Sequence, residues 1–268
     1  MKQRLDTLLV DLNLCTSRQE AQRLIRAGEV LVNQQIVDKP GTEIETTAAI
    51  QIKEKSPYVS RGGEKLAKAL KEFGIPVEGR ICLDGGISTG GFTDCLLQAG
   101  AKKVYGVDVG YGQVAWNLRN DERVVLKERT NFRYLQPAEL YGDGEPADLG
   151  VVDVSFISLT KILDALWNLL QPPREVVLLV KPQFEVGRER VGKKGVVRDS
   201  NDHADAIAQV LQAAQKLGWT YKGLTWSPIT GPAGNIEYLL WLGMDSQTST
   251  PDLAAIKQIT QSAVSDLR

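Results

Sequence analysis

The sequence has little histidine and cysteine, two residue types on which metal sites, disulfides and many catalytic triads depend. His203 is the only histidine. Because it stands at the start of a predicted helix, we expect a surface residue and no histidine-based triad. The three cysteines, Cys15, Cys82 and Cys95, are odd in number and have no C-x-x-C spacing. That pattern argues against a disulfide framework and a zinc site, and it suits a reducing compartment.

Long apolar runs are absent as well. No segment approaches the ~18 apolar residues of a membrane span, and the N-terminus M-K-Q-R-L-D has no apolar signal core. We therefore expect a cytoplasmic protein.

Neither sign of charge is in excess, with 32 Lys and Arg against 33 Asp and Glu, so a nucleic-acid partner must be argued from local clusters. With 43% apolar residues over 268 positions, the chain can bury the core of one large domain and one small one.

The N-terminal segment has the pattern of a small basic module. Leucines recur at helical spacing in residues 3–14, and Ser17 opens a second helix whose outer face is rich in arginine. Residues 29–37 then read as two short strands around a polar turn. On this pattern alone, a solvated helix face is as good an interpretation of the arginines as a binding surface.

The run R-L-D-x-L-L-V-x-x-x-L-x-x-S-R-x-x-A-x-x-L-I-x-x-G-x-V-x-V-N, from Arg4 to Asn33, favours the binding surface. It resembles the alpha-L motif, an RNA-binding module shared by a ribosomal small-subunit protein, pseudouridine synthases and a tyrosyl-tRNA synthetase. In that family the basic helix and the following turn lie on the RNA backbone, which positions a protein without specifying sequence. The resemblance implies RNA contacts at Arg4, Arg18, Arg23, Arg26 and Lys39.

A change of pattern near Pro57 marks a domain boundary. Proline disfavours helix at the residue before it, and the charged connection there ends the basic module. We therefore expect a small α+β RNA-binding domain at 1–58 and a larger domain at 59–268. The larger domain opens with a helix that Ser60 caps and Gly74 ends.

The larger domain then alternates strands and helices, which predicts a doubly wound, Rossmann-like α/β fold with a seven-stranded sheet. Ligands of such a sheet lie at the carboxyl ends of its strands, where Asp108, Asp153 and Lys181 stand. Helices are expected from Ser158, at 202–217 and at 252–267. The expected strands lie near residues 81–84, 101–108, 123–127, 147–154, 175–181, 219–226 and 236–242.

The stretch Ile81–Asp94, I-C-L-D-G-G-I-S-T-G-G-F-T-D, has the layout of a first βα turn that holds a nucleotide-like ligand at a helix N-terminus. A dinucleotide fingerprint fails because Ser88 replaces a required glycine, and a phosphate-binding loop at Gly187 fails because Lys194 replaces the magnesium-binding Ser or Thr. A nucleoside with a short amino-acid tail fits better, with Asp108 accepting from its ribose hydroxyls. S-adenosylmethionine is such a ligand, while spacing alone leaves a nicotinamide cofactor open. The predicted cofactor contacts are Asp84, Gly86, Ser88, Thr89, Gly90, Gly91, Phe92 and Asp108.

Seven motifs follow one another in the chain: D-G-G-x-S-T-G-G-F-T-D, V-D-V-G-Y-G-Q, E-R-T-N, V-D-V-S-F-I-S-L, V-K-P-Q-F-E, G-V-V-R-D and S-P-I-x-G-P-x-G-N-x-E-Y-L. Together they resemble the TlyA family over nearly the whole chain. In that family an alpha-L module is fused to a methyltransferase of the FtsJ type. The match departs at Gly85 and Ile87, where the family more often has an aliphatic residue and alanine. Family members are described as ribosomal RNA 2′-O-methyltransferases acting on cytidines, and some carry a label as haemolysins.

The resemblance further implies a catalytic Lys-Asp-Lys-Glu tetrad, whose matching positions are Lys65, Asp153, Lys181 and Glu237. A ribose 2′-hydroxyl is a poor nucleophile, and a nearby lysine stabilises the developing alkoxide or, when neutral, accepts the proton. We expect Lys181 in that role, with Asp153 and Glu237 orienting the two lysines and no metal required. Taken singly, each residue could equally be a strand-end charge or a structural ion pair.

Other reactions and functions fit less well. Methylation of a cytosine ring carbon needs a cysteine nucleophile, but Cys82 and Cys95 lie inside the predicted strand and helix of the turn. Methylation of an exocyclic amine goes with an Asn/Asp-Pro-Pro-aromatic loop, which Asp153-Val-Ser-Phe156 does not match. A membrane-active haemolysin is disfavoured because the chain has neither a span nor a strongly basic amphipathic helix. A non-catalytic ribosome-binding protein is the third alternative.

Residues 181–198 form a basic segment beside the expected site. A mobile solvated loop is the simplest interpretation. The alternative is a lid that grips RNA, in particular through Lys193 and Lys194, and orders on binding. The expected partner is ribosomal RNA in ribosomal subunits. The basic side chains of this segment are Lys181, Arg188, Arg190, Lys193, Lys194 and Arg198.

Overall fold

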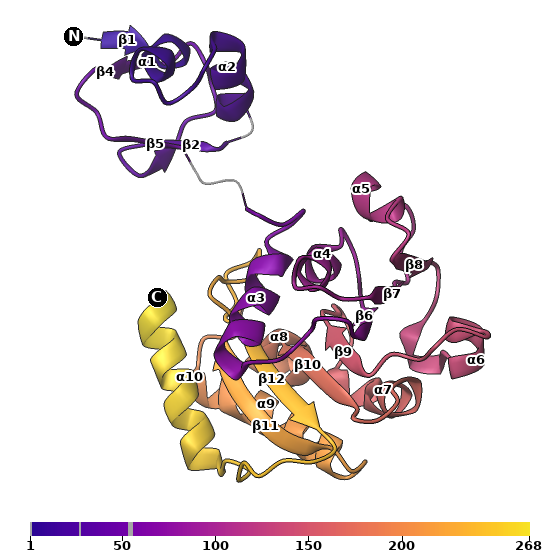
Figure 1. Ribbon diagram of the computed structural model, residues 1–268. Coiled ribbons are helices and arrows are strands. Elements are labelled where there is room, and N and C mark those ends of the chain that lie inside the picture. Colours follow the sequence, from indigo (N-terminus) through magenta and orange to yellow (C-terminus); the bar gives the residue numbers. More distant parts are fainter. Residues whose placement is uncertain (1, 27, 53–55) are drawn as a thin grey trace. The chain divides into compact units, whose positions relative to one another are not determined.

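The computed structural model describes residues 2–26, 28–52 and 56–268. The chain divides into two compact units, Met1–Ser56 and Pro57–Arg268 (Figure 1). The boundary that the sequence suggests after residue 58 lies two residues beyond this division.

The N-terminal unit is a small α+β domain, as expected. Its elements are β1 (Lys2–Arg4), α1 (Leu5–Asp11), α2 (Arg18–Arg26), β2 (Val30–Val32), β3 (Gln35–Ile36), β4 (Glu43–Glu45) and β5 (Ile50–Ile52). Leu5 and Leu9 of α1 pack with Ala21 and Ile25 of α2 over the β3-β2-β5 sheet. The pair β1–β4 is not among the expected strands. It takes the first residues of the segment expected to be helical, so α1 begins only at Leu5.

The C-terminal unit contains the seven expected strands in one sheet, in the order β11-β12-β10-β9-β6-β7-β8. The five strands β10, β9, β6, β7 and β8 are parallel, whereas β12 runs antiparallel to both β10 and β11. The strands are β6 (Ile81–Gly85), β7 (Lys103–Val107), β8 (Val124–Lys127), β9 (Leu149–Val152), β10 (Glu175–Val180), β11 (Thr220–Trp226) and β12 (Tyr238–Gly243).

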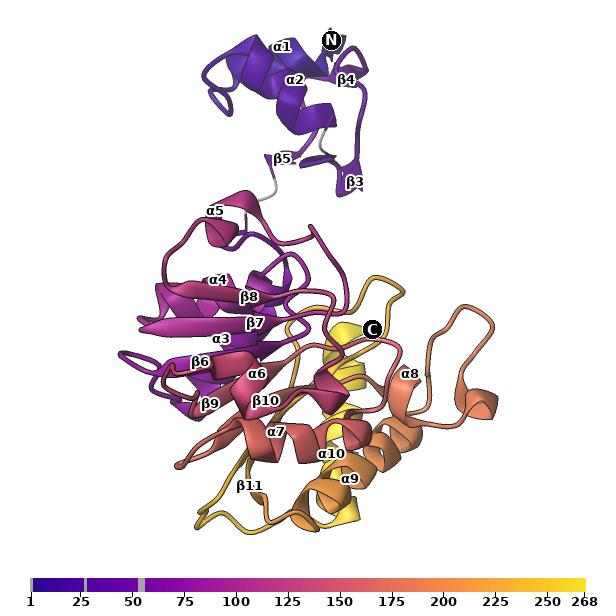
Figure 2. The ribbon, with the colours of Figure 1, turned by 90° about the vertical axis from the view of Figure 1, so that its right-hand side faces the viewer.

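Helices cover both faces of this sheet (Figure 2). The helices of the C-terminal unit are α3 (Gly62–Phe73), α4 (Gly91–Gln98), α5 (Trp116–Arg119), α6 (Pro137–Tyr141), α7 (Leu163–Leu169), α8 (Pro182–Glu185), α9 (Ser200–Gln215) and α10 (Leu253–Leu267). Successive side chains of β6 enter opposite cores: Cys82 packs with α3 and α4, and Leu83 with α7, α9 and α10. Such central strands are buried on both faces, which explains their nearly continuous apolar sequence.

Two expectations need correction. His203 is fully buried inside α9 and not at the surface, because its ring bonds to the Tyr238 hydroxyl and to the Val197 carbonyl oxygen. The helix expected from Ser158 begins as a 3₁₀ turn at Leu159–Lys161 before α7 starts.

Candidate active site

The sheet topology brings the four predicted catalytic residues to one edge. Asp153 directly follows β9, and Lys181 directly follows β10, its parallel neighbour. The start of β12 lies opposite the end of β10, so Glu237, one residue before β12, reaches the same edge. Lys65 comes from α3, which packs beside β12. Residues far apart in sequence therefore meet where the sheet changes from parallel to antiparallel.

The four side chains form two ion pairs. Lys65 Nζ lies 2.5 Å from Glu237 Oε2, and Lys181 Nζ lies 2.6 Å from Asp153 Oδ1. Both lysine side chains are 9% exposed and that of Glu237 is 2% exposed, so removing one partner would leave a charge in a poorly solvated place. Lys181 also donates to Ser155 Oγ over 2.8 Å, which fixes the direction of its ammonium group.

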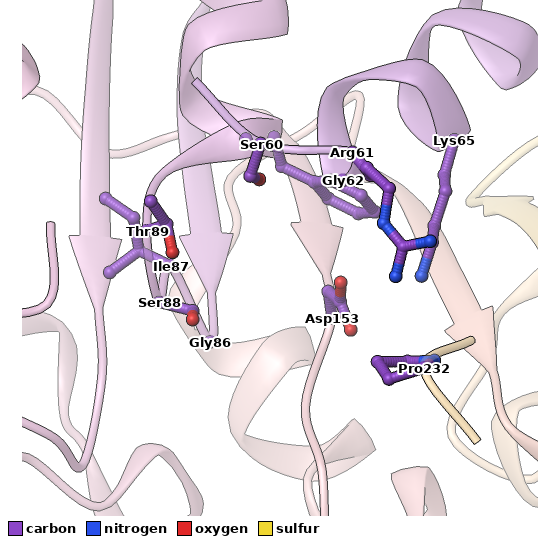
Figure 3. A pocket seen from close by; sticks show the side chains of 12 residues that line it. Ser60, Arg61, Gly62, Lys65, Gly86, Ile87, Ser88, Thr89, Asp153 and Pro232 are labelled. Carbon is purple, nitrogen blue, oxygen red and sulfur yellow. The ribbon is translucent and has the colours of Figure 1, made fainter. Parts of the chain in front are cut away.

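Two adjoining cavities open at this edge of the sheet. One, of about 200 Å³, lies between the glycine-rich turn and the start of α3 and includes Lys65 (Figure 3). The other, of about 450 Å³, includes Asp108 at the end of β7. Both are lined by Gly86, Ser88 and Asp153. The larger volume lies within the ~300–1,000 Å³ typical of small-molecule sites.

Most of the predicted cofactor contacts line these cavities. The exceptions are Asp84 and Gly90. Gly90 adopts a left-handed backbone before α4, and a Cβ there would lie 2.4 Å from Leu118 Cδ1. Ile87, where the family pattern differs, buries its side chain beside Gly106 of β7. The lining contacts are Gly86, Ser88, Thr89, Gly91, Phe92 and Asp108.

The turn and Asp108 fit a nucleoside with a polar tail. A Cβ on Gly86 would lie 2.5 Å from the Asp153 carbonyl oxygen, so only glycine lets the turn approach β9 this closely. The Asp108 carboxylate accepts from the backbone N–H groups of Ser88 at 2.8 Å and Gly110 at 2.7 Å. These two bonds hold it at the cavity wall, and its remaining lone pairs can accept from ribose hydroxyls.

Asp84 has a supporting place beneath the turn. Its Oδ2 accepts from the Thr93 hydroxyl at 2.7 Å, while its Oδ1 has no hydrogen-bond partner in the described part of the chain. Burial raises the pKa of Asp84 to about 7, so near neutral pH the carboxyl is shared between its neutral and charged forms.

We expect Asp84→Asn to change how stability depends on pH. Because the pKa of Asp84 is raised on folding to about 7, the native state holds a proton that the unfolded state releases. Stability of the unsubstituted protein must therefore fall from about pH 4 to pH 7, by at most about 1.4 kcal/mol per pH unit from this group. The variant lacks this loss, so its thermal midpoint relative to the unsubstituted protein should rise between pH 5 and pH 8. Asp143→Asn, at an exposed aspartate, is the control, and a pH-independent difference for Asp84→Asn would contradict the assignment.

Several cavity residues are absent from the set predicted by sequence. Arg61 reaches with Lys65 toward Asp153, and Pro232 forms the opposite wall (Figure 3). Asn131 and Phe132 line the larger cavity. Asn131 and Pro232 lie in the motifs E-R-T-N and S-P-I-x-G-P-x-G-N-x-E-Y-L, and Arg61 lies four residues before Lys65. The sequence signal therefore marks these segments, although it does not single out these residues.

The N-terminal unit has a buried anion that the sequence does not predict, Asp6 of α1. Arg4 Nη2 and Arg18 Nε each lie 3.0 Å from Asp6 Oδ2, and Gln22 donates to the same oxygen at 2.9 Å. The hydrogen bond from Arg4, with those from Gln22 and Arg18, holds the pKa of the Asp6 carboxyl well below its usual range despite burial. Arg18 thus helps to join α2 to Asp6 of α1, and Arg4 pairs with Asp6 from the end of β1. The five predicted RNA contacts are all exposed: Arg4, Arg18, Arg23, Arg26 and Lys39.

Comparison with protein families agrees with this division. The FtsJ-like methyltransferase family model matches residues 58–244, and the S4 domain model matches residues 3–50. A solved structure from Streptococcus thermophilus is 44% identical, with a TM-score of 0.77 over 99% of this chain and 96% of that chain.

Curated relatives extend over most of the chain. YqxC of Bacillus subtilis is 54% identical over 242 residues, which cover 90% of this chain and 85% of the relative. The 16S/23S rRNA (cytidine-2′-O)-methyltransferase TlyA of Mycobacterium tuberculosis is 49% identical over 241 residues, 89% of each chain. Hemolysin A of Brachyspira hyodysenteriae is 45% identical over 236 residues, 88% of this chain and 98% of the relative. The fold, the two-domain matches and these relatives confirm what the motifs predict: the chain belongs to the TlyA family, with an S4 domain followed by an FtsJ-like methyltransferase domain.

Proposed function

We propose that this protein transfers a methyl group from S-adenosylmethionine to the 2′-hydroxyl of a cytidine ribose in the ribosomal RNA of ribosomal subunits. The observation that carries the proposal is the two ion pairs, Lys65–Glu237 and Lys181–Asp153, beside cavities that fit a nucleoside with a polar tail. Cys82 and Cys95 are buried in β6 and α4, which argues against a cysteine nucleophile and methylation of a ring carbon.

S-adenosylmethionine supplies an electrophilic methyl group on its sulfonium. We assign Lys181 to the ribose 2′-hydroxyl, where its ammonium stabilises negative charge on the oxygen and its neutral form accepts the hydroxyl proton. Asp153 and Ser155 hold the Lys181 ammonium in one direction. Asp153 also lines both cavities, so its carboxylate attracts a cation bound between them.

The second pair, Lys65–Glu237, supplies another cation, the Lys65 ammonium, at the wall of the smaller cavity. Lys65 lines the smaller cavity and stabilises the same developing oxygen charge, while Glu237 fixes its ammonium position. Alignment of the hydroxyl with the methyl group accounts for much of the remaining rate, because holding two reactants in line can supply ~7–11 kcal/mol.

Exposed aromatic rings near the larger cavity support an RNA substrate with an unpaired nucleotide. Phe156 lines that cavity and is 92% exposed. Its backbone lies in the left-handed region at φ 65°, a strained conformation for an aromatic residue of the kind found at functional sites. Tyr111 is exposed and lies 4.2 Å beneath the Arg129 guanidinium. Aromatic faces and guanidinium planes are the groups on which unstacked RNA bases rest.

The choice of nucleotide rests on the relatives. The M. tuberculosis relative is named for cytidine 2′-O-methylation of 16S and 23S rRNA, and a Campylobacter jejuni relative, 40% identical over 185 residues, for that of 23S rRNA. A membrane-active haemolysin is favoured by names alone, those of Hemolysin A and of solved structures from Streptococcus thermophilus and Lactococcus lactis. No helix in residues 2–26, 28–52 and 56–268 is long and apolar enough to cross a membrane.

The test is methyl transfer to purified 30S and 50S subunits from a bacterium that lacks a TlyA-family enzyme. Subunits are incubated with the protein and S-adenosylmethionine, and digested rRNA is analysed by mass spectrometry. We expect 2′-O-methylcytidine at a discrete position. Methylation on a base, or no transfer while S-adenosylmethionine binds, would contradict the proposal. Dye release from lipid vesicles without methyl transfer would favour the haemolysin instead.

Neutralising Arg23 or Arg26 should weaken RNA binding without changing sequence preference. Each exposed arginine that meets a phosphate displaces counterions, so Arg23→Gln should lower the slope of log affinity against log salt concentration by about 1, and Arg26→Gln likewise. Filter binding of rRNA at several salt concentrations measures the slope. Arg123→Gln, which loses a surface ion pair with Asp121 in the larger unit, is the control. An unchanged slope in both α2 variants would remove this helix from the RNA contact.

A further inference from the structure

The basic segment 181–198 is anchored near its C-terminal end by the side chain of Asn235. Asn235 is 2% exposed. Its Oδ1 accepts from the Val197 N–H at 3.0 Å, and its Nδ2 donates to the Gly195 carbonyl oxygen at 2.8 Å. One amide group thus satisfies two backbone groups of the segment, as a neighbouring strand would. This part of the chain is therefore held in place, and the exposed Lys193 and Lys194 directly precede it.

His203 provides a second connection to the same place. Its Nε2 bonds to the Val197 carbonyl oxygen at 3.0 Å, and its Nδ1 bonds to the Tyr238 hydroxyl at 2.8 Å. A carbonyl oxygen can only accept, so Nε2 must carry the proton. Burial lowers the pKa of His203, and in the neutral ring Nδ1 then accepts from the Tyr238 hydroxyl. Asn235 and Tyr238, which lie on either side of Glu237, are thereby both connected to Val197.

The loop before Asn235 also touches the active site. Gly231 donates its N–H to the Asn235 carbonyl oxygen at 2.8 Å. A Cβ on Gly231 would lie 2.6 Å from Glu237 Oε1, so the backbone there closes directly over this carboxylate. Pro232, the next residue, lines the smaller cavity (Figure 3). Displacement of Asn235 would therefore move the wall against which Glu237 rests.

We propose that Asn235 is a positioning residue, which seats residues 195–197 against the 231–235 loop and so keeps the Glu237 carboxylate aligned with Lys65. The proposal rests on the proposed function, because Glu237 acts there through Lys65. Seating of the basic segment is then a condition for a correctly placed ion pair. One buried amide therefore connects the segment that contains Lys193 and Lys194 with the edge of the sheet where Glu237 lies.

Asn235→Ala removes both hydrogen bonds and leaves the Val197 N–H and the Gly195 carbonyl unpaired. We expect kcat for methyl transfer to ribosomal subunits to fall about tenfold, a shift of the kind caused by a small misplacement. The KM for S-adenosylmethionine should stay within about twofold. Trypsin cleavage after Lys193 and Lys194 should accelerate, which reports release of the segment independently of activity. Asn235→Asp retains the acceptor for the Val197 N–H but lacks the donor for the Gly195 carbonyl oxygen. Its kcat should therefore lie between those of the unsubstituted protein and Asn235→Ala.

Asn201→Ala is the matched control, since Asn201 donates to neighbouring Asp199 at the exposed start of α9; its kcat should not change. Faster trypsin cleavage with unchanged kcat in Asn235→Ala would overturn the proposal, and so would an equal loss of S-adenosylmethionine affinity. If Asn235→Ala does not fold, Asn235→Asp decides by the same measurements. Absence of methyl transfer by the unsubstituted protein would instead refute the proposed function, and the trypsin assay would still report on the anchor.

Discussion

Replacement of Lys181 by alanine should lower kcat for methyl transfer by about 10²–10⁴-fold, the usual contribution of a positioned acid or base. The variant loses the ammonium group that Asp153 and Ser155 hold at the edge of the site. Asp153 lies at the wall of both cavities and is less buried than Glu237, so its unpaired carboxylate can be hydrated. The fold should therefore persist. S-adenosylmethionine affinity, measured by calorimetry, should change much less than kcat.

Lys222→Ala is the matched control for this experiment. Lys222 also forms a 2.6 Å ion pair, with Glu175, but at the opposite end of β10 from Lys181. It tests whether the loss of any partly buried lysine reduces activity. Full activity in Lys181→Ala, or an equal loss in Lys222→Ala, would contradict the role given to Lys181.

Single and double substitutions in the Lys65–Glu237 pair should separate its contribution to stability from its contribution to catalysis. Lys65→Ala leaves Glu237, 2% exposed, as an unpaired buried charge, and breaking such a pair costs about 3–5 kcal/mol of unfolding free energy. Replacing both partners, as Lys65→Met with Glu237→Leu, removes both charges and keeps most of the volume. We expect the double variant to recover most of the lost stability. The rate of methyl transfer by the double variant should remain as low as that of Lys65→Ala, because the Lys65 ammonium is still missing.

Urea unfolding of the two variants and the unsubstituted protein provides the free energies, and initial rates on ribosomal subunits provide the activities. A double variant that recovers stability and activity together would show that the pair only supports the fold. A single variant as stable as the unsubstituted protein would mean that Glu237 finds water or another cation when Lys65 is absent.

The sequence predicted much of this molecule because its signals are local or sequential. The alternation of apolar strands and amphipathic helices predicted all seven strands of the sheet. The glycine turn after β6 predicted the edge of the sheet at which a ligand is expected. The resemblance to FtsJ-type methyltransferases predicted Lys65, Asp153, Lys181 and Glu237 as candidates. The short strands β1 and β4 were not predicted, because three residues are too few for a periodic pattern and because their pairing joins segments about 40 residues apart.

Burial of isolated polar residues was the other failure. His203 was expected at the surface, and no burial was predicted for Asp6, yet both are fully buried. Asp6 is stabilised there by Arg4 and Arg18, and His203 by Tyr238 and Val197. A sequence pattern reports the hydrophobicity of a side chain, and it does not report whether a distant partner will satisfy its hydrogen bonds.

By itself, the sequence determined the two domains and the seven-stranded α/β fold, because strand periodicity and the order of motifs are properties of the chain. Its resemblance to FtsJ-type methyltransferases predicted the four ionisable residues as candidates. Only the tertiary structure decided which lysine pairs with which carboxylate. That choice follows from the antiparallel insertion of β12 between β10 and β11, which carries Glu237 to the end of β10 and beneath α3. The same insertion brings Asn235 to the basic segment. A hydrogen bond requires its donor and acceptor to lie about 3 Å apart, and the order of the strands, not the distance along the chain, decides which residues come that close.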